Sequence, residues 1–400
     1  MEKIVISGKD KKDERNSVYD LINWFDTQKV KAAKVMVVGA GALGNEVLKH
    51  FALLNIGNVL IVDFDTIELS NLSRSVLFRE SDCGKGAYKA EVASERIKEL
   101  NPKIATMVIK GDIISDIGLG VFRRMDAIVG CLDNRLARLY INRYAFKAGK
   151  MWVDGAIENL IGKLDVYEMG KGCYECQLTE PEIAIIRHRL GCADIANRYY
   201  SAGRIPTTSI SSSIIGAMQA QEALKIIHGF TKNYRSGLQF HYDGMNNMTA
   251  DVPFGDIKDE CESHFIYDPV HEATELSQGS TIAEVMDWVK TKLNIAKPVI
   301  KLDHEVVLEI STEKSNRTIP VFKPKFRFTQ AEIESYQEVE DEKVLFSKVI
   351  KRIEDDFPFM QASLKEIGIP ALHILYVLDN ENHEIYFVET TGDIDFLSFK

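Results

Sequence analysis

Hydrophobic and polar residues alternate along the first two thirds of the chain in blocks that predict a doubly wound α/β sheet. Residues 35–38 are four consecutive apolar residues, which is typical of a strand buried on both faces of a parallel sheet. Apolar residues then recur at helical spacing between Val47 and Leu54, and residues 59–62 form a second apolar run that closes a β-α-β unit. The same alternation predicts further helices at 88–100, 135–148 and 214–227, and further strands at 105–109, 127–130, 151–154 and 162–169, the last of them an antiparallel edge strand.

The pattern is different at the two ends of the chain. Residues 13–34 indicate a polar to amphipathic helical lead, and after residues 275–280 a capping box formed by Thr281 and Glu284 begins a helix with one apolar face. Strands are expected at 299–302, 305–310, 318–322, 372–378 and 384–389, with a hairpin turn at 379–382, and a helix is expected on Leu345, Val349, Ile350 and Ile353. We therefore expect an N-terminal helical lead (1–34), a Rossmann-like domain with an antiparallel extension (35–268) and a smaller C-terminal α+β domain (270–400).

Composition and charge narrow the class of protein. A chain of 400 residues, 45% of them hydrophobic, has room for two or three domains with packed cores. The formal net charge of −10 argues against a general nucleic-acid binder. The basic start is followed by no long apolar run, and no 18 apolar residues occur together, so we expect a cytoplasmic protein that does not span a membrane. In a reducing compartment the six cysteines are packing residues, metal ligands or nucleophiles.

Three glycines follow the first predicted strand at a spacing that suits phosphate binding. Gly39, Gly41 and Gly44 have the G-x-G-x-x-G spacing, which lets backbone amides approach a phosphate at the positive end of the next helix. A dehydrogenase, a flavoenzyme or a tight turn with no ligand could carry the same motif. The residues that follow have to distinguish these possibilities.

Those residues suit a triphosphate better than a nicotinamide cofactor. Asp63 ends the second strand, where a carboxylate can accept hydrogen bonds from a ribose. Asn71 and Arg74 follow, and Arg donates in a fork to phosphate oxygens while Asn orients phosphate or metal-bound water. Lys89, at a helix start, is either a second phosphate cation or a solvated surface lysine. Asp133 follows the strand at 127–130, where a carboxylate can hold Mg²⁺.

Together these segments resemble the ThiF/MoeB family of adenylyltransferases, to which ubiquitin-activating enzymes belong. The resemblance covers about residues 15–265 and rests on five short segments in order, which are GAGALG (39–44), DFD (63–65), SNLSR (70–74), KAEVA (89–93) and CLDN (131–134). Members of the family use MgATP to adenylate the C-terminal glycine carboxylate of a small β-grasp protein.

The resemblance implies a nucleotide site in this chain. It would comprise the glycine turn with Ala42, Asp63 on the ribose, its neighbour Asp65, the phosphate ligands Asn71, Arg74 and Lys89, and Asp133 on the magnesium ion. Two departures from the family pattern are visible: Ser75 follows Arg74 where Gln is common, and the run to Lys89 is longer by two residues, so Lys85 is a rival for the phosphate role.

A further implication concerns the quaternary structure. In family members an Arg about twenty residues before the first strand reaches across a dimer to the ATP of the partner, and Arg15 precedes Val35 by 20 residues (35 − 15). The resemblance therefore implies a homodimer. A lone Arg in a polar leader can equally be only solvated.

Four residues have the spacing of a structural zinc site. Cys173 and Cys176 form a C-x-x-C knuckle, and Cys261 and His264 form a C-x-x-H knuckle 85 residues later (261 − 176). A redox C-x-x-C is the alternative, but thioredoxin-like motifs do not bring a distant C-x-x-H. Family members commonly carry zinc here on four cysteines, so His264 would replace one of them.

A different cysteine is a candidate nucleophile. Cys192 lies in the region that forms a mobile crossover loop in the family, and in members that pass the activated protein onward this loop carries the Cys that attacks the acyl-adenylate. Its charged neighbours Arg187, His188, Arg189 and Arg198 would lower a thiol pKa or are simply surface charge. An incidental cysteine is the alternative reading.

We therefore expect an enzyme that uses ATP, Mg²⁺ and Zn²⁺ to activate a small ubiquitin-like protein ending in Gly, to form a thioester on Cys192 and to pass the protein to a conjugating partner. The C-terminal domain is expected to be ubiquitin-like or to dock a partner. The alternatives are a sulfur-carrier adenylyltransferase in cofactor biosynthesis and, from another class, an NAD(P)-dependent oxidoreductase.

Overall fold

The computed structural model describes residues 15, 17–191, 206–230, 235–339 and 342–400, without the side chains of residue 185 and of residues 187–191. Eight strands form one sheet in the order β3-β2-β1-β4-β5-β6-β7-β8. Strands β1 to β5 pair in parallel, and β6 to β8 continue the sheet in antiparallel pairs, which confirms the predicted fold class. The strand expected at the edge, 162–169, is instead β6 inside the sheet, because β7 and β8 pair beyond it. The strands are β1 (Lys34–Val38), β2 (Asn58–Val62), β3 (Ala105–Ile109), β4 (Ala127–Gly130), β5 (Trp152–Glu158), β6 (Ile161–Tyr167), β7 (Leu238–Asp243) and β8 (Met248–Pro253).

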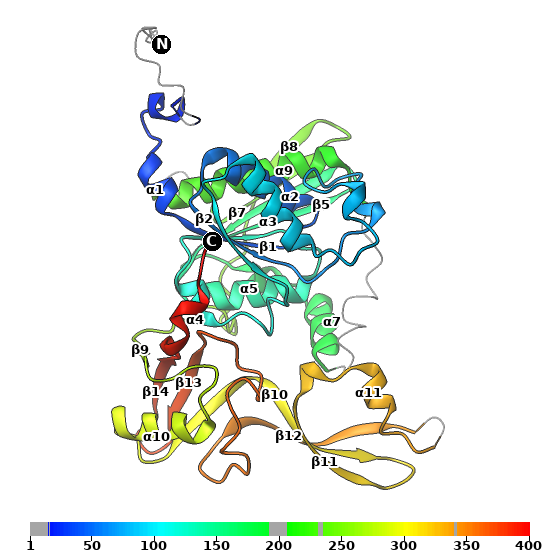
Figure 1. Cartoon of the computed structure of the whole chain (residues 1–400), viewed down its shortest axis with the longest axis vertical. Coiled ribbons are helices and arrows are strands. Elements are labelled where there is room, and N and C mark those ends of the chain that lie inside the picture. Colours follow the sequence, from blue (N-terminus) through cyan, green and yellow to red (C-terminus); the bar gives the residue numbers. More distant parts are fainter. Residues whose placement is uncertain (1–14, 16, 192–205, 231–234, 340–341) are drawn as a thin grey trace.

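Helices cover both faces of this sheet (Figure 1). Side chains alternate between the faces of a strand, so Val35 and Val37 pack under α2, α3 and α9, while Met36 and Val38 pack against α4 and α5. The helices of this part are α1 (Thr27–Ala32), α2 (Ala42–Leu54), α3 (Lys89–Leu100), α4 (Leu119–Arg123), α5 (Arg135–Lys147), α6 (Tyr174–Gln177), α7 (Glu180–Gly191) and α9 (Ser209–His228).

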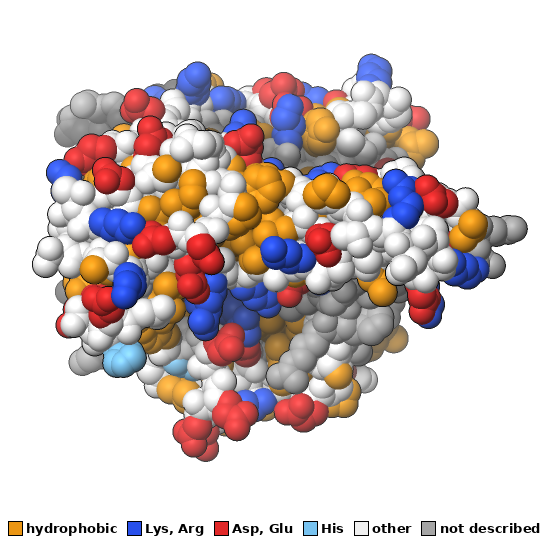
Figure 2. All heavy atoms as spheres, turned by 90° about the horizontal axis from the view of Figure 1, so that it is seen from below, with side chains coloured by type: hydrophobic (Ala, Val, Ile, Leu, Met, Phe, Trp, Pro, Cys, Tyr) orange, Lys and Arg blue, Asp and Glu red, His pale blue; other side chains and the backbone are white. Residues whose placement is uncertain are grey.

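A second sheet of six strands lies below α4 and α5 in Figure 1. Its path is β11-β10-β13-β14-β9, and β12 pairs with the long central strand β10. Figure 2 shows the molecule from below the view of Figure 1. Hydrophobic side chains gather in the middle of this lower face, and charged side chains lie around them. The elements are β9 (Val270–Glu272), α10 (Ile282–Lys292), β10 (Pro298–Thr312), β11 (Thr318–Pro324), α11 (Gln330–Glu334), β12 (Val344–Ile353), β13 (Ile374–Asp379) and β14 (Glu384–Glu389).

The two sheets share hydrophobic packing. Leu372, Ile374 and Phe387 of the second part belong to the same buried cluster as the residues of α4 and α5. The last residue, Lys400, exchanges two backbone hydrogen bonds with Thr106 of the edge strand β3 (2.9 and 3.0 Å). The second sheet is therefore fixed to the first by apolar contacts and by the end of the chain.

Two predicted helices were wrong. The described residues of the expected lead at 13–34 do not form one helix, because Asp26 has an extended backbone and caps a new helix, α1, after a short 3₁₀ turn at Tyr19–Leu21. Residues 345–353 lie in strand β12. Its pairing with β10 is interrupted by register shifts, so its apolar residues need not alternate strictly. Their irregular spacing in the sequence imitates that of a helix.

None of the helices in the described part of the chain combines the length and the apolar character that crossing a bilayer requires.

Candidate functional site

The glycine turn connects β1 to α2, and its glycines have different roles. Gly39 has φ +95°, and a Cβ atom there would lie 2.4 Å from the carbonyl oxygen of Cys131. A Cβ atom on Gly44 would lie 2.0 Å from the carbonyl oxygen of Gly39, whereas one on Gly41 would meet nothing within 4 Å. Gly39 and Gly44 thus permit close packing, and Gly41 borders open space. Gly41 also precedes Ala42, the first residue of α2, and provides no side-chain cap for that helix, so its first amide groups are available to an anion.

Asn45 fixes this turn, and sequence reasoning missed it. Its side-chain amide donates to the carbonyl oxygens of Ala40 (2.7 Å) and Gly41 (3.0 Å), and its side-chain oxygen accepts from the backbone N–H of Leu77 (2.8 Å). The side chain is fully buried. A polar residue on the apolar side of α2 was the signal that could have identified it.

Asp63, Asp65 and Lys89 meet beside the turn. The Asp63 carboxylate accepts from the backbone N–H groups of Ala40 and Asp65, both at 2.7 Å. Burial raises the pKa of Asp63 to about 6, although the nearby Lys89 opposes this shift. Lys89 begins α3, and its ammonium group is 2.7 Å from Asp65. The structure thus brings the carboxylate expected to bind ribose and a lysine to one edge of the sheet, the carboxyl ends of its parallel strands.

The segment after β2 carries the other proposed phosphate ligands. Asn71 accepts from the backbone N–H of Glu68 (2.9 Å), and Arg74, which is half-buried, donates to the carbonyl oxygen of Ser70 (2.8 Å). Both side chains keep further donors that these bonds do not use. Lys85 is exposed and makes no hydrogen bond or ion pair with the part of the chain that the structure describes.

Asp133 lies in the loop after β4, next to β1 at the same edge of the sheet. Asn134 caps α5 by accepting from the backbone N–H groups of Leu136 (2.8 Å) and Ala137 (3.4 Å). Asp133 itself is exposed and has no hydrogen-bond or ion-pair partner among the described residues. Its carboxylate is therefore available to a cation, whereas Asn134 has a structural task.

Arg138 on α5 holds this loop against β5, and sequence reasoning missed it as well. Its guanidinium group pairs with Asp154 on β5 (2.9 Å) and donates to the carbonyl oxygens of Leu132 and Gly155. Leu132 immediately precedes Asp133. An arginine between leucines on a buried helix face was the available signal.

The four predicted zinc ligands lie together. The Sγ atom of Cys173 is 3.7 Å from that of Cys176 and 3.6 Å from that of Cys261, and Cys176 Sγ is 3.3 Å from Nε2 of His264. All four atoms lie within 4.8 Å of one another. Sulfur atoms about 3.8 Å apart are what tetrahedral bonds of ~2.3 Å to zinc require. The donor set fits a closed structural zinc site.

Arg15 is not part of this site. It is exposed, and its guanidinium group donates to the carbonyl oxygen of Leu100, at the end of α3 opposite Lys89. Cys192 and Arg198 lie outside the described residues. Arg187, His188 and Arg189 lie in α7, where the side chains are not described.

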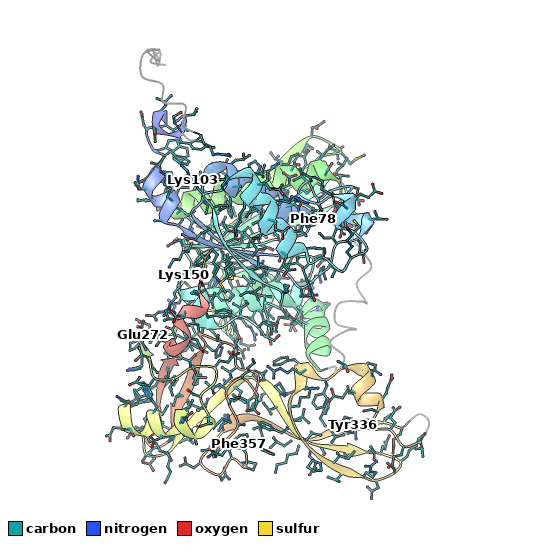
Figure 3. All side chains as sticks on the ribbon, in the orientation of Figure 1. Phe78, Lys103, Lys150, Glu272, Tyr336 and Phe357 are labelled. Carbon is teal, nitrogen blue, oxygen red and sulfur yellow. The ribbon has the colours of Figure 1, made fainter. Side chains whose placement is uncertain are left out.

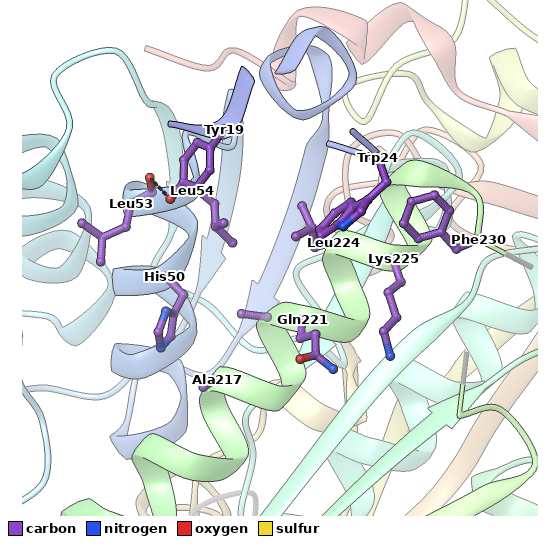
Figure 4. Close-up of a pocket in the computed structure, with 11 residues that line it drawn as sticks. Tyr19, Trp24, His50, Leu53, Leu54, Ala217, Gln221, Leu224, Lys225 and Phe230 are labelled. Atoms are coloured by element: carbon purple, nitrogen blue, oxygen red, sulfur yellow. Dashed lines mark hydrogen bonds between the residues drawn. The ribbon is translucent and has the colours of Figure 1, made fainter. Parts of the chain in front are cut away.

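A groove of about 780 Å³ lies elsewhere, between the N-terminal segment, α2 and α9 (Figure 4). Trp24, Leu53 and Leu224 give it an apolar lining, and His50 and Lys225 add polar groups. None of the residues discussed for the nucleotide site lines it.

Comparisons with known proteins identify the family. The model of the ThiF family matches residues 14–263. The chain is 31% identical over 218 residues to the sulfur carrier protein adenylyltransferase of Thermus thermophilus, which covers 51% of this chain and 73% of that protein. It is 30% identical to the molybdopterin-synthase adenylyltransferase of Escherichia coli (55% and 83% covered) and 34% identical to SUMO-activating enzyme subunit 2 of Dictyostelium discoideum (37% and 22% covered).

Among solved structures, a crystal structure of E. coli MccB with succinimide has a TM-score of 0.51 and 24% sequence identity, covering 62% of this chain and 74% of that chain. This likeness supports the fold.

The share of each relative's length that this chain covers differs widely. It ranges from under a quarter for the SUMO-activating enzyme subunit to about four fifths for the molybdopterin-synthase adenylyltransferase.

Proposed function

Because the chain belongs to the ThiF family, we propose that it is an adenylyltransferase that uses MgATP to activate the C-terminal carboxylate of a small ubiquitin-like or sulfur-carrier protein. The observation that carries this proposal is the meeting of an uncapped helix start, the Asp63 and Lys89 side chains and the free carboxylate of Asp133 at one sheet edge. Hydride transfer by an oxidoreductase does not require the free carboxylate of Asp133.

The proposed reaction needs little covalent help from the protein. One carboxylate oxygen of the small protein attacks the α-phosphorus of ATP, the bond from this phosphorus to the bridging oxygen breaks, and pyrophosphate leaves. The product is an acyl-adenylate. Rate then depends on positioning and on cations that stabilise the negative charge that develops on the phosphates.

Each residue of the edge has a proposed part in this. The glycine turn and the start of α2 hold phosphate oxygens, and Asp63 accepts the ribose hydroxyl groups. Arg74, Asn71 and Lys89 bind phosphate oxygens, for which Lys89 exchanges its present partner Asp65. Magnesium bound to Asp133 would neutralise phosphate charge.

The metal cluster has a structural role in this proposal. Zinc on Cys173, Cys176, Cys261 and His264 would join α6 to the segment after β8. Cys176→Ser should lower the zinc content of the purified protein from one ion per chain to none or a weakly held one, together with its thermal stability. Freshly purified protein that holds no zinc, measured by elemental analysis, would remove this part of the proposal.

The finer proposal is that the substrate is ubiquitin-like, that Cys192 then takes the activated protein as a thioester, and that a conjugating enzyme receives it. The presence of the second sheet, which we propose docks this partner, favours it. The names of the bacterial relatives favour a sulfur carrier instead. Localisation in the cytoplasm and a homodimer in which Arg15 reaches the ATP of the partner subunit belong to the same proposal.

Pyrophosphate exchange tests the activity. Radiolabelled pyrophosphate should enter ATP only when a small protein ending in Gly is present, and removal of that Gly should abolish the signal. Turnover of NADH without any exchange would refute the proposal.

A separate experiment tests the thioester. Wild-type protein should form a conjugate that thiols release, and Cys192→Ala should form the adenylate but no such conjugate. A sulfur-carrier adenylyltransferase would give the adenylate with both proteins and the thiol-sensitive conjugate with neither.

A further inference from the structure

Asp165 is a buried carboxyl group to which the proposed reaction assigns no task. It lies on β6 directly opposite Asp154 on β5, and residues paired in this way place their Cβ atoms about 4.5–5.5 Å apart on the same face of the sheet. Both residues are buried, with 6% and 4% of their surface exposed. Two carboxyl groups this close cannot both ionise without a cost.

The hydrogen bonds treat the two carboxyl groups differently. Asp154 is the ion-pair partner of Arg138, at 2.9 Å. Asp165 accepts only neutral donors on one oxygen, the hydroxyl of Tyr167 (3.2 Å) and the side-chain amide of Gln239 (3.1 Å). Its other oxygen, Oδ1, is buried and has no hydrogen-bond partner among the described residues. Oδ1 is therefore the oxygen that can carry a proton without losing a hydrogen bond, and protonation removes the cost of burying a charge there.

The electrostatics agree with this geometry. Burial and the neighbouring Asp154 raise the pKa of Asp165 to about 7, while Gln239, Tyr167 and the more distant Lys163 lower it. Arg138 is the cation that pairs with Asp154, and it also donates to the carbonyl oxygen of Leu132, next to Asp133.

We propose that Asp165 is a positioning residue: while it carries a proton, Asp154 is the only anion that Arg138 must balance, and the guanidinium group holds the loop with Asp133 in place. Loss of the proton to solvent adds a second negative charge beside Asp154. The guanidinium group then divides its hydrogen bonds between two carboxylates and the Leu132 carbonyl, and the loop is held less firmly.

The nucleotide experiment rests on the proposed function. For the wild-type protein, the Kd for MgATP measured by calorimetry should rise about three- to tenfold between about pH 6 and pH 8. Asp165→Asn, which imitates the protonated form, should keep the low Kd across this range. Asp243→Asn is a control at the end of β7, where the carboxylate accepts from turn amides, and it should follow the wild type. ATP itself titrates in the same way with every protein, so differences between the profiles come from the protein. Arg138→Lys should weaken binding at every pH because it loses the fork.

A second measurement needs no nucleotide. Because Asp165 holds its proton in the folded protein at a pH where the unfolded chain has lost it, the contribution of Asp165 to wild-type stability should fall as pH rises from about 4 to about 7, and Asp165→Asn should lack this part of the slope. If this slope differs as expected but no variant binds ATP, the proposed function fails and the protonation of Asp165 stands. Parallel Kd profiles for wild type and Asp165→Asn, or a Kd that rises in Asp165→Asn at every pH, would overturn the proposal.

Discussion

The edge of the first sheet and the junction between the two sheets carry the same kinds of side chains but use them differently. At the junction, Glu389 is completely buried and pairs with Arg123 and Arg124. At the sheet edge, the carboxylate of Asp133 has no partner in the part of the chain that the structure describes. Figure 3 places Glu272, a further partner of Arg123 at 2.9 Å, where the second sheet meets the lower helices. Charges satisfied within the chain hold the fold, and charges left free mark the place for a ligand.

The largest expected effect tests the free carboxylate. Asp133→Asn keeps the shape of the side chain but removes its charge, so pyrophosphate exchange should fall about 10²–10³-fold while the melting temperature stays the same. Asn134→Ala is the matched control in the same loop, since it removes the cap of α5. It should cost about 1 kcal/mol of stability and leave most of the exchange activity. Equal losses of activity in both variants would contradict the role proposed for the free carboxylate of Asp133.

The junction should respond in stability instead. Glu389→Gln removes the buried anion that two arginines share, and of the two, Arg123 keeps another ion-pair partner, Glu272. We expect a loss of about 2 kcal/mol in unfolding free energy, below the ~3–5 kcal/mol of a fully buried pair because both arginines reach solvent. Denaturant unfolding measures it. Glu272→Gln removes the half-exposed partner of Arg123 and should change stability by less than about 0.5 kcal/mol. A similar cost for both substitutions would show that burial at the junction is not what matters.

Sequence patterns were reliable where burial was uniform. Strands β1, β2 and β4 are buried on both faces and so appear as plain apolar runs, and the glycine spacing and the two knuckles led directly to the sheet edge and the metal cluster. The second sheet was harder to predict. Residues 299–302 and 305–310 were expected to be two strands but belong to one, β10. The polar residues Asp303 and His304 interrupt the apolar pattern, but the backbone continues as one strand that pairs with β11, β12 and β13.

Site residues that act through other residues were also missed. Asn45 accepts from the backbone N–H of Leu77, and Arg138 donates to the carbonyl oxygen of Gly155. Both partners are distant in sequence, so no local spacing reveals them. Their roles follow only from the way the loops are brought together.

The two regions should also differ in the sign of their pH dependence. Burial raises the pKa of Asp63, so the folded protein keeps its proton there while the unfolded chain loses it, and Asp63 lowers stability as pH rises from about 4 to about 6, by an amount on the order of 2 kcal/mol. At the junction, burial opposes ionisation of Asp303, but Lys147 and His373 outweigh it and hold the pKa of Asp303 well below its usual range. Asp303 therefore adds stability above about pH 4 that is lost as the pH falls.

Two variants measure these opposite slopes. Denaturant unfolding of Asp63→Asn should lose less stability than the wild type between about pH 4 and pH 6. Asp303→Asn should be less stable than the wild type near neutral pH, and the difference should shrink below about pH 4. Slopes of the same sign for both variants would show that the sheet edge and the junction treat a carboxylate alike.

The smallest expected effect separates the two lysines that compete for the phosphate role. Lys89 begins α3 and is held beside Asp63 through its contact with Asp65, whereas Lys85 is exposed and has no partner among the described residues. A positioned cation should matter to the reaction, and a solvated one is screened. Pyrophosphate exchange should therefore fall at least about tenfold in Lys89→Ala and change by less than about twofold in Lys85→Ala. The reverse order would move the phosphates toward Lys85 and would mean that the ion pair seen between Lys89 and Asp65 belongs to the fold, as the pairs of the junction do.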